Sequence, residues 1–496
     1  MGYYLTVDGG TESLRARVYD ENGSCLGSKA VAYQTQFAPG GRAEQDPADW
    51  WANFISASKA AIKEAGIDSS DVVSICYATT SCSVVALDEN GNALRPAMIW
   101  MDVRASEETE AVLATGDAAL KFNGNGRGPV SAEWMIPKAL WLKRNEPEHY
   151  KAAYRICEYQ DYLTYKLTGE WAASLDNVGL RWHYDNAGNG WADGLVDALG
   201  MSDILDKWPP RVVAPGDVIG TLCANAASAL GLPASVKVVQ GGADALIGMI
   251  GLGVAKPGQL ALITGSSHLL FGVTETAMHA PGMWGAYPDI VYPGRYIVEG
   301  GQTSTGSIIN WLGRMSGTGM DYEALNDAAE KLSPGSDGLL VQDHFQGNRT
   351  PYTDPLSRGA IVGLTLAHEK HHVFRAMMES IGFGTRAILD SFARAGYTSG
   401  EITVGGGAAA SPLFLQIHAD TAALPVRVPE SPDAPSTGSA VLAAVGAGQF
   451  SSIDEGIEAM VKPGREIEPI AANVTAYEAI YERYLKLYPA LKEVLA

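Results

Sequence analysis

The feature that most constrains this fold is a pattern of strand, polar turn and strand that occurs twice in the sequence. The first copy, YYLTVDGGTESLRARVYDENG, spans residues 3–23 and joins an apolar segment to one in which apolar and polar residues alternate. The second copy, QLALITGSSHLLFGV, spans residues 259–273 and joins two apolar segments. Each copy predicts a β-hairpin, so we expect the two halves of the chain to be versions of one fold.

The turn of the first hairpin is rich in small and polar residues. Asp8, Gly9, Gly10, Thr11 and Ser13 form a tight connection whose backbone N–H groups could face an anion while the carboxylate faces a metal. Taken alone, such a turn is more typical of a plain hairpin. A nucleotide held between two hairpins of this kind would receive N–H groups or hydroxyls from both, so the pair favours phosphate binding.

Composition limits the partners of the chain. It has 496 residues, 46% of them hydrophobic, which predicts two or three domains. There are 56 acidic and 36 basic residues and the net charge is -20, so we expect neither nucleic acid nor an anionic membrane as a partner. The five cysteines include no CxxC pair, and the sequence has no leader and no apolar run of transmembrane length. These features predict a cytoplasmic protein.

Short apolar strands alternate with helical segments along the chain, which predicts a mixed α/β fold. The segment GLGVAKPGQ, residues 251–259, separates two richly patterned halves. We therefore expect an N-terminal domain over residues 1–248, a C-terminal domain over residues 249–450 and a helical extension over residues 451–496.

A carboxylate follows a strand in the segment VKVVQGGADALIGMIGLG, which predicts a strand, a turn at Gly241 and Gly242, and a helix that begins at Asp244. Sheets of this type bind ligands beyond the carboxyl ends of their strands, where Asp244 falls. A carboxylate there could accept the proton of a hydroxyl that attacks a phosphorus atom. The same residue could instead serve only as the N-cap of its helix.

A glycine loop occurs in the segment EITVGGGAAASPLFLQIHAD. It predicts a strand, three glycines at 405–407, and a helix capped by Ser411 with Pro412 in its first turn. Such a loop lets a base or a phosphate approach the backbone closely. A simple strand-to-helix turn explains the glycines equally well.

The segment HEKHH, residues 368–372, matches the H-E-x-x-H signature of zinc peptidases. His368 and His372 would lie one helical turn apart, with Glu369 as a candidate base, so a metallopeptidase is an alternative class. No third histidine follows at short spacing, and the motif opens a helix with ordinary core periodicity. Both observations count against zinc.

In this order and spacing, the motifs resemble the FGGY carbohydrate kinases, and the resemblance covers nearly the whole chain. DGGTESLRARVYDENG is similar to the phosphate hairpin that opens the family, GGADALIGMIGLG to its catalytic-base region, and GGGAAASPLFLQIHAD to the signature of its second domain. The resemblance implies an α/β, two-domain fold of the actin and hexokinase type (ribonuclease H-like) with an interdomain cleft. It also implies transfer of the γ-phosphate of ATP to a sugar or polyol hydroxyl, with Mg²⁺ as the cofactor.

The resemblance also implies roles for single residues. Asp8 would help to hold Mg²⁺ through water, and Asp244 would be the general base and would also contact the metal. In the second hairpin the family usually has Gly-Thr-Ser, and here Ser266 replaces the threonine and keeps its hydroxyl. The residues implied in nucleotide and phosphate binding are Thr11, Ser13, Arg15, Gly265, Ser266, Ser267, Gly306, Asn310, Gly406, Gly407 and Ala408.

Three further segments resemble the ribulose-kinase branch of the family: ATTSCSVVALDENG, IWMDVRA and EGGQTSTG. The first lacks the arginine–glutamate pair of glycerol kinases and the His-Gly-Gln of xylulose kinases. Some of these residues have a structural alternative: Cys82 as a small buried thiol, Asp102 with Arg104 as an ion pair, and Glu299 as a strand-end carboxylate. The residues implied in sugar binding are Ser81, Cys82, Ser83, Asp102, Arg104, Arg181 and Glu299.

The expected reaction is therefore phosphorylation of a primary hydroxyl of a pentulose, with ribulose as the first choice. Erythritol, ribitol, xylulose and glycerol stay open as alternatives, because the shape of the pocket decides among such substrates. The expected partners are the sugar and ATP, and a homodimer is left open.

Overall fold

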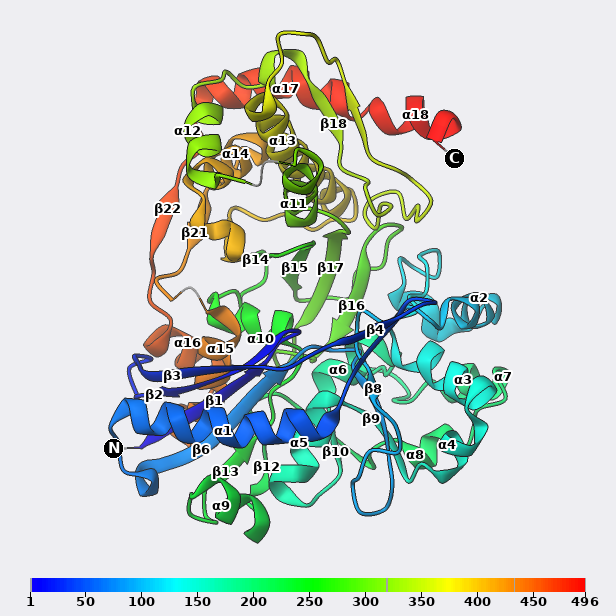
Figure 1. The fold of residues 1–496 in the computed structure, drawn as a ribbon, viewed down its shortest axis with the longest axis vertical. Coiled ribbons are helices and arrows are strands. Elements are labelled where there is room, and N and C mark those ends of the chain that lie inside the picture. Colours follow the sequence, from blue (N-terminus) through cyan, green and yellow to red (C-terminus); the bar gives the residue numbers. More distant parts are fainter. Residues whose placement is uncertain (1, 318–319, 432, 496) are drawn as a thin grey trace.

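The computed structural model describes residues 2–317, 320–431 and 433–495, which form two α/β lobes and a smaller flanking region (Figure 1). In the view of Figure 1 the N-terminal lobe lies at the bottom, the C-terminal lobe at the top, and the flanking region at the lower right. Each lobe contains one large mixed sheet.

The N-terminal sheet has six strands in the order β12-β13-β6-β1-β2-β3. Strands β1, β2 and β3 form an antiparallel meander. Strands β6 and β13 lie on the other side of β1 and run parallel to it. The bounds of its strands are β1 Tyr3–Gly9, β2 Ser13–Tyr19, β3 Cys25–Ala32, β6 Val72–Thr79, β12 Val218–Thr221 and β13 Lys237–Val239.

The C-terminal sheet has seven strands in the order β16-β17-β15-β14-β20-β21-β22. Strands β14, β15 and β17 form an antiparallel meander, while β20 and β21 run parallel to β14 on the other side. The bounds of its strands are β14 Leu260–Thr264, β15 His268–Thr274, β16 Trp284–Pro288, β17 Tyr296–Gln302, β20 Ile402–Gly406, β21 Val426–Val428 and β22 Arg465–Ile467.

Five strands of each sheet therefore share one order and direction, β13-β6-β1-β2-β3 and β21-β20-β14-β15-β17, which confirms the prediction that the halves repeat one design. The hairpin β1–β2 and the hairpin β14–β15 hold equivalent places in their sheets. Buried strands flank both turns, because the apolar residues of the two hairpins fill the cores of the lobes.

Helices cover both faces of the N-terminal sheet. Helix α1 (Pro47–Ala65) packs on β2 and β3, and its ends are encoded locally by the N-cap Asp46 and by Gly66 at a φ of 65°. On the other face lie α10 (Asp244–Gly251) and α15 (Ala434–Ala447), and α15 packs on β1 and β6. Helix α15 therefore packs on the N-terminal lobe although it follows the last parallel strand of the C-terminal sheet.

Helices α10 and α15 cross at a point where their backbones nearly touch. A Cβ atom added to Gly251 would lie 1.9 Å from the carbonyl oxygen of Ala434, and one added to Gly438 would lie 2.0 Å from that of Ile247. Only glycine permits this approach. The crossing sets the position of α10, whose first residue is Asp244.

The flanking region carries a five-stranded sheet in the order β4-β5-β8-β7-β9 and several short helices, packed on their own hydrophobic core. Its elements and the short neighbours of the N-terminal lobe are β4 Gln36–Ala38, β5 Arg42–Gln45, β7 Val84–Leu87, β8 Ala97–Met98, β9 Arg155–Glu158, β10 Ala172–Ser174, β11 Arg211–Val213, α2 Ser106–Ala114, α3 Met135–Asn145, α4 Pro147–Ala152, α5 Tyr159–Thr168, α6 Leu175–Arg181, α7 Asp193–Ala198, α8 Ile204–Lys207 and α9 Ala224–Leu230.

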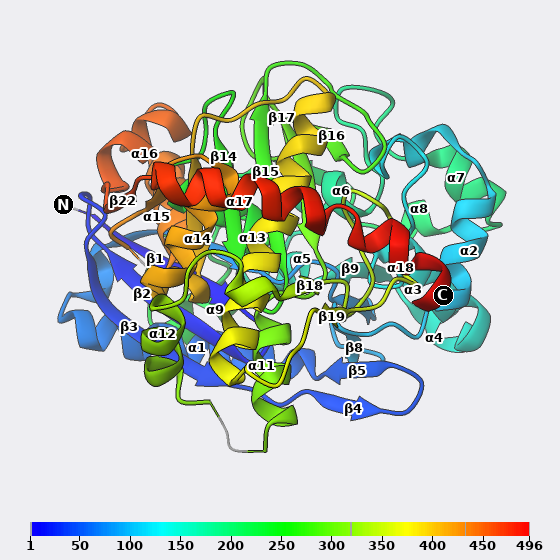
Figure 2. The ribbon, with the colours of Figure 1, turned by 90° about the horizontal axis from the view of Figure 1, so that it is seen from above.

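The C-terminal lobe is covered by long helices, and α17 and α18 lie at its top in Figure 1 and run across the middle of the view in Figure 2. The side chains of Tyr477, Tyr481 and Tyr484 pack around Phe383 of α13. Within the described ranges, no helix combines the length and the apolar character needed to cross a membrane. The remaining elements are α11 Gly306–Met315, α12 Tyr322–Glu330, α13 Lys370–Arg394, α14 Pro412–Ala422, α16 Ile453–Met460, α17 Ala471–Tyr484, α18 Leu487–Leu495, β18 Leu340–Gln342 and β19 Ala360–Val362.

The HEKHH segment marks the start of α13. Glu369 and His372 form a capping box, in which the backbone N–H of Glu369 donates to His372 Nδ1 at 3.1 Å. His372 Nε2 also lies 3.3 Å from Asp337 Oδ2. Among the described residues, histidine, cysteine and acidic side chains form no group of three or more suited to a metal. The motif thus has a structural role at a helix terminus.

Candidate active site

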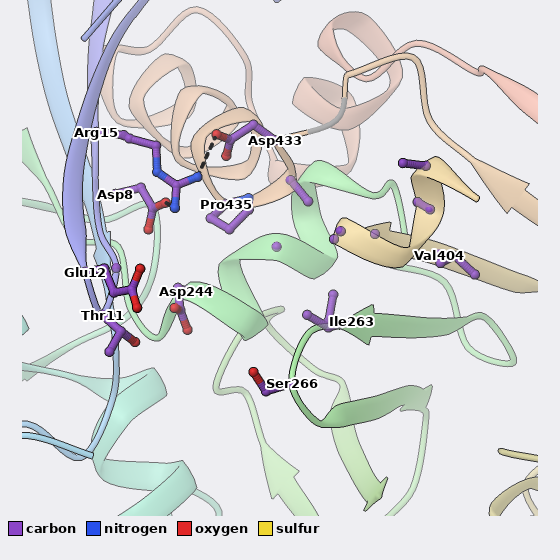
Figure 3. Close-up of a pocket in the computed structure, with 18 of the residues that line it drawn as sticks. Asp8, Thr11, Glu12, Arg15, Asp244, Ile263, Ser266, Val404, Asp433 and Pro435 are labelled. Atoms are coloured by element: carbon purple, nitrogen blue, oxygen red, sulfur yellow. Dashed lines mark ion pairs between the residues drawn. The ribbon is translucent and has the colours of Figure 1, made fainter. Parts of the chain in front are cut away.

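A cleft of about 1470 Å³ lies between the lobes, and its walls come from segments that are far apart in the sequence. They include the turn of the first hairpin, the start of α10, the turn of the second hairpin, the glycine loop at the end of β20 and the start of α15. Figure 3 shows Asp8, Thr11 and Glu12 on one side, Ser266 on the other, and Asp244 between them.

Asp8 and Asp244 form a carboxylate pair at the bottom of this cleft. Asp8 is the last residue but one of the buried strand β1 and is 3% exposed, and Asp244 is the first residue of α10. The pKa of each carboxyl is raised to about 6, chiefly by burial, and the charge of Asp244 contributes to the rise at Asp8. Asp8 Oδ1 is buried and has no hydrogen-bond partner among the residues that the structure describes. A cation would offset both costs.

Arg15 places a positive charge beside the carboxylates. Its guanidinium lies 3.6 Å from Asp8 Oδ2 and 3.7 Å from Asp433 Oδ2, and Figure 3 marks the contact with Asp433. Arg17 also forms an ion pair with Asp433 and donates to Ser436 Oγ at 2.9 Å. The start of α15 is therefore tied to the first hairpin by two arginines.

The turn of the second hairpin and the glycine loop form the opposite wall of the cleft, where their backbone is exposed. The backbone N–H of Gly306 donates to the carbonyl of Gly265 at 3.2 Å, which draws the start of α11 onto this turn. Gly406 has a φ of 93° and lies so close to β14 that a Cβ atom would meet the carbonyl oxygen of Thr264 at 2.1 Å. The strand-to-helix turn here requires glycine, and its backbone remains open to the cleft.

The structure gathers many of the residues predicted for phosphate and metal binding on the wall of this cleft, whereas Gly265, Ser267, Gly306, Asn310 and Ala408 are not among the residues that line it. Asn310 accepts a hydrogen bond from the Tyr322 hydroxyl at 2.8 Å. Predicted residues that line the cleft are Asp8, Thr11, Ser13, Arg15, Asp244, Ser266, Gly406 and Gly407. Lining residues that the sequence reasoning missed include Glu12, Trp100, Glu133, Ser307, Gln346, Asp433 and Arg465.

Asp102 and Arg104 form a buried ion pair with two donors of Arg104 directed at one carboxylate, Nη2 at 2.6 Å and Nε at 2.8 Å. Arg104 Nη2 also lies 2.6 Å from Glu44 Oε1, and the backbone N–H of Ala43 donates to Asp102. The pair holds the segment that contributes Trp100 to the cleft wall.

Arg181 and Glu299 come from different lobes and meet at the floor between them. Their two hydrogen bonds measure 2.7 and 3.0 Å, and Arg349 Nη1 lies 3.5 Å from the same carboxylate. Burial opposes ionisation of Glu299, but the two arginines hold its pKa below the usual value. The carboxylate expected to bind a sugar hydroxyl is thus paired with protein cations.

The segment Ser81–Ser83 lies beside this floor. Cys82 is buried and has a φ of 62°, an uncommon value for a residue other than glycine. Burial, followed by the charge of Glu158, raises the pKa of its thiol to about 12, and Glu133 adds to the rise. Glu133 is therefore close to Cys82, and its carboxylate has no hydrogen-bond or ion-pair partner among the described residues.

Comparison with known proteins places this arrangement in a family. Residues 3–251 match the N-terminal domain, and residues 260–447 the C-terminal domain, of the FGGY family of carbohydrate kinases. The chain is 30% identical to the human FGGY carbohydrate kinase domain-containing protein, over 100% of this chain and 97% of the relative. It is 31% identical to the ribulokinase of Mycolicibacterium smegmatis, over 98% and 93% of the two chains.

Among solved structures, the xylulose kinase of Rhodospirillum rubrum superposes with a TM-score of 0.88 at 27% identity and covers 99% of both chains. The two lobes of similar topology, the hairpin with a polar turn in each lobe and the carboxylate pair in the cleft between them agree with this match. The chain therefore belongs to the FGGY family of carbohydrate kinases, the enzymes that transfer phosphate from ATP to sugars.

Proposed function

We propose that this kinase phosphorylates a primary hydroxyl of a neutral pentulose, with ribulose as the first choice. The observation that carries the proposal is the carboxylate pair of Asp8 and Asp244, which faces the turns of both hairpins across one cleft. Phosphoryl transfer needs a positioned base, a cation and backbone donors around the phosphates, and the residues of this cleft can provide each of them.

The residues present fit a magnesium ion. Mg²⁺ binds through one or two carboxylates and keeps several waters, and Asp8 offers a buried oxygen without a partner. Asp8 would hold the ion, in part through water, and Asp244 would approach it from the start of α10. When bound, Mg²⁺ would neutralise charge on the oxygens of the transferred phosphoryl group.

Asp244 is the proposed general base. With a pKa of about 6 it is ionised at neutral pH and can accept the proton of the sugar hydroxyl. The hydroxyl oxygen forms a bond to the γ-phosphorus as the bond from that phosphorus to the bridging oxygen breaks, and ADP leaves with the electron pair. Positioning contributes most of the rate in such a transfer.

The phosphates would bind between the two hairpins. Arg15 supplies charge, and the backbone near Gly406 lets the nucleotide approach closely. We assign to this role the hydroxyls and N–H groups of Thr11, Ser13, Gly265, Ser266, Ser267, Gly306, Asn310, Gly407 and Ala408.

The charges of the cleft favour a neutral substrate. The cationic side chains on its wall are Arg15 and Arg465, which lie on the phosphate and nucleotide sides. At the sugar end of the cleft, by which we mean the side with Trp100 and Glu133, Arg104 is paired with Asp102, and Arg181 and Arg349 share the carboxylate of Glu299. A sugar acid would meet cations that already contact carboxylates, whereas the carboxylate of Glu133, unpartnered among the described residues, suits the hydroxyls of a neutral sugar.

The choice of ribulose rests on the resemblance of Ser81, Cys82, Ser83 and Glu299 to the ribulose-kinase branch. A sugar hydroxyl that reaches Glu299 would share its carboxylate with Arg181 and Arg349, so we assign this residue a supporting contact. Relatives named ribulokinase and xylulose kinase are similarly close, which keeps xylulose as the second candidate. The five cysteines are all unpaired, as a reducing cytoplasm would keep them.

A coupled assay of ADP release tests the proposal, with Mg-ATP and a panel of D- and L-ribulose, xylulose, ribitol, erythritol, glycerol and gluconate. We expect strong turnover with one ribulose and none with gluconate. Turnover with xylulose or a polyol alone would keep the kinase and replace the substrate. Turnover with gluconate above all neutral sugars would overturn the charge argument.

A further inference from the structure

Lys138 is a fully buried lysine that the proposed chemistry does not use. It lies in α3 at 0% exposure, and its ammonium group faces three backbone carbonyls. Nζ donates to the oxygens of Cys82 at 2.7 Å, Ile99 at 2.7 Å and Met98 at 3.2 Å. A lysine has three donors and no acceptor, so this site uses its full capacity.

The three carbonyls belong to two separate segments that meet at the sugar end of the cleft. One contains Cys82 in the middle of Ser81–Ser83, and the other contains Ile99, directly before Trp100. Strands β7 and β8 pair at Val84 and Met98, and the lysine extends this link past the end of the ladder, to the carbonyls of Cys82 and Ile99. A buried charge is an expensive way to fill a core, so an apolar residue would suffice if packing were the only requirement.

Glu158 holds the opposite end of the same peptide unit. Its carboxylate accepts from the backbone N–H of Cys82 at 2.8 Å, from Asn177 at 2.9 Å and from Trp182 at 2.6 Å. Cys82 is thus held by the ammonium group of Lys138 at its carbonyl and by the carboxyl group of Glu158 at its N–H. Two such contacts can maintain its left-handed φ of 62°, which a free chain would rarely adopt.

The second segment leads to the phosphate end of the cleft. Trp100 lines the cleft, and its indole Nε1–H donates to the hydroxyl of Thr11 at 2.9 Å. The contacts therefore run from Ser81–Ser83 through Lys138 to Ile99, and through Trp100 to the first hairpin. A shift of the lysine would move the sugar wall relative to the phosphates.

We infer that Lys138 is a positioning residue that sets Ser81–Ser83 and Trp100 relative to the phosphate hairpin, and so determines how the sugar hydroxyl is presented to Asp244. The inference rests on the proposed sugar kinase function. It predicts that loss of the lysine impairs use of the sugar far more than use of ATP.

Because Lys138 can lose its charge, the inference also predicts a pH dependence of sugar affinity, which a purely packing role would not produce. Burial lowers the pKa of Lys138 to about 8, although Cys82, Asp102, Glu133 and Glu158 oppose the shift. The ammonium form therefore holds all three carbonyls at neutral pH and is lost as the pH rises through about 8. Sugar affinity should fall over the same range.

The test compares Lys138→Met with Lys143→Met, a lysine of the same helix whose contacts are to Gly200 and Asp203 instead. We expect Lys138→Met to raise the KM for the sugar about 10- to 100-fold and to change the KM for ATP less than about twofold. Lys143→Met should leave both values near those of the wild type. Equal changes in both KM values for Lys138→Met would overturn the inference.

Amide hydrogen exchange without sugar separates this inference from the proposed function. In Lys138→Met the amides of residues 81–83 and 98–101 should exchange faster than in the wild type, whether or not any sugar in the panel is phosphorylated. Unchanged exchange there would overturn the positioning role. If the variant fails to fold, the same test can be made on the wild-type protein at pH 7 and pH 9, with exchange rates corrected for their intrinsic pH dependence. Faster exchange at these two segments at pH 9 supports the inference. An equal change across the whole protein contradicts it.

Discussion

At the scale of single residues, substitution of Asp244 is the most direct test of the proposed chemistry. Asp244→Asn removes the proton acceptor and keeps the shape, so we expect kcat to fall about 10²- to 10⁴-fold. The helix should survive, because Asp244 accepts only from the backbone of its neighbour Ala245. Thermal shift with Mg-ADP checks that nucleotide binding is retained. Turnover within a few-fold of wild type would remove Asp244 from its role.

The pH dependence of the same carboxylates gives a second prediction. Burial holds the pKa values of Asp8 and Asp244 near 6, above their usual value, so both must lose a proton before the cleft can act. We expect kcat/KM to rise with pH through about 6 and to level off above it. A profile that is flat between pH 5 and pH 7 would contradict this assignment.

The stability of the fold should change with pH in the direction opposite to kcat/KM. Between about pH 4 and pH 6 the folded chain holds more protons on these carboxylates than the unfolded chain does, so the free energy of unfolding falls as the pH rises. Mg-ADP should therefore raise Tm more at pH 7.5 than at pH 5, since the cation offsets the repulsion of the ionised pair. Equal shifts at the two pH values would argue against a metal at Asp8.

Glu299 provides a test of the buried pair between the lobes. Glu299→Ala leaves Arg181 and Arg349 without their counter-charge, and removal of one partner from a buried pair costs about 3–5 kcal/mol. Urea unfolding measures the loss, and Glu170→Ala, which breaks an exposed pair with Arg211, should cost about 0–1 kcal/mol. Among the folded molecules, we expect the KM for the sugar to rise more than that for ATP. Similar costs for the two variants would contradict the prediction.

At the scale of elements, the crossing of α10 and α15 determines where Asp244 stands. A methyl group at Gly251 would lie 1.9 Å from the carbonyl of Ala434, so Gly251→Ala must push the helices apart. We expect a loss of about 1–3 kcal/mol in the free energy of unfolding, together with reduced kcat, because Asp244 begins α10. Gly400→Ala is the matched control, since nothing lies within 4 Å of that position. If Gly251→Ala changed neither the free energy of unfolding nor kcat, the crossing would tolerate displacement of the helices, contrary to the prediction.

The start of α13 shows how an element can imitate a catalytic motif. His368, Glu369 and His372 match a zinc signature in sequence, but in space Glu369 and His372 exchange capping contacts and His372 also faces Asp337. The two histidines of the signature are four residues apart, whereas the capping box joins Glu369 to His372, three residues apart, so His372 takes part in both patterns. Sequence alone could not separate these interpretations, because the difference lies in whether the helix has begun at Glu369 or earlier.

At the scale of the whole molecule, the size of the cleft indicates an open state. Its volume of about 1470 Å³ exceeds the range of about 300–1,000 Å³ that is usual for a ligand pocket. The chain passes between the lobes where α10 leads to β14, where β21 leads to α15, and where α16 leads to β22. Few connections of this kind allow one lobe to rotate on the other.

We therefore expect Mg-ADP and the sugar together to close the cleft. Small-angle scattering should show a smaller radius of gyration with both ligands than with either alone, since each lobe contributes part of the site. ADP in place of ATP keeps the complex from turning over. Scattering curves that coincide under all conditions would contradict closure.

Much of the fold, and many of the residues that line the cleft, could be predicted from the sequence because the signals are local. The two hairpins, the turn before Asp244 and the glycine loop each consist of a strand followed by residues that permit an unusual backbone. Asp433 had no comparable signal, since it is one acidic residue before a helix. Its contact with Arg15 depends on how α15 packs on the N-terminal sheet.

The sugar end could be predicted only in part, and the physical reason is sequence separation. Arg181 and Glu299 are 118 residues apart, and Lys138 reaches carbonyls 56 and 39 residues away. The sequence by itself determined the duplicated sheets and the backbone of the phosphate hairpins, because short-range conformational preferences specify them. Only the tertiary structure decided which charges pair and which remain free, because such pairing depends on how separate elements approach one another in the folded chain.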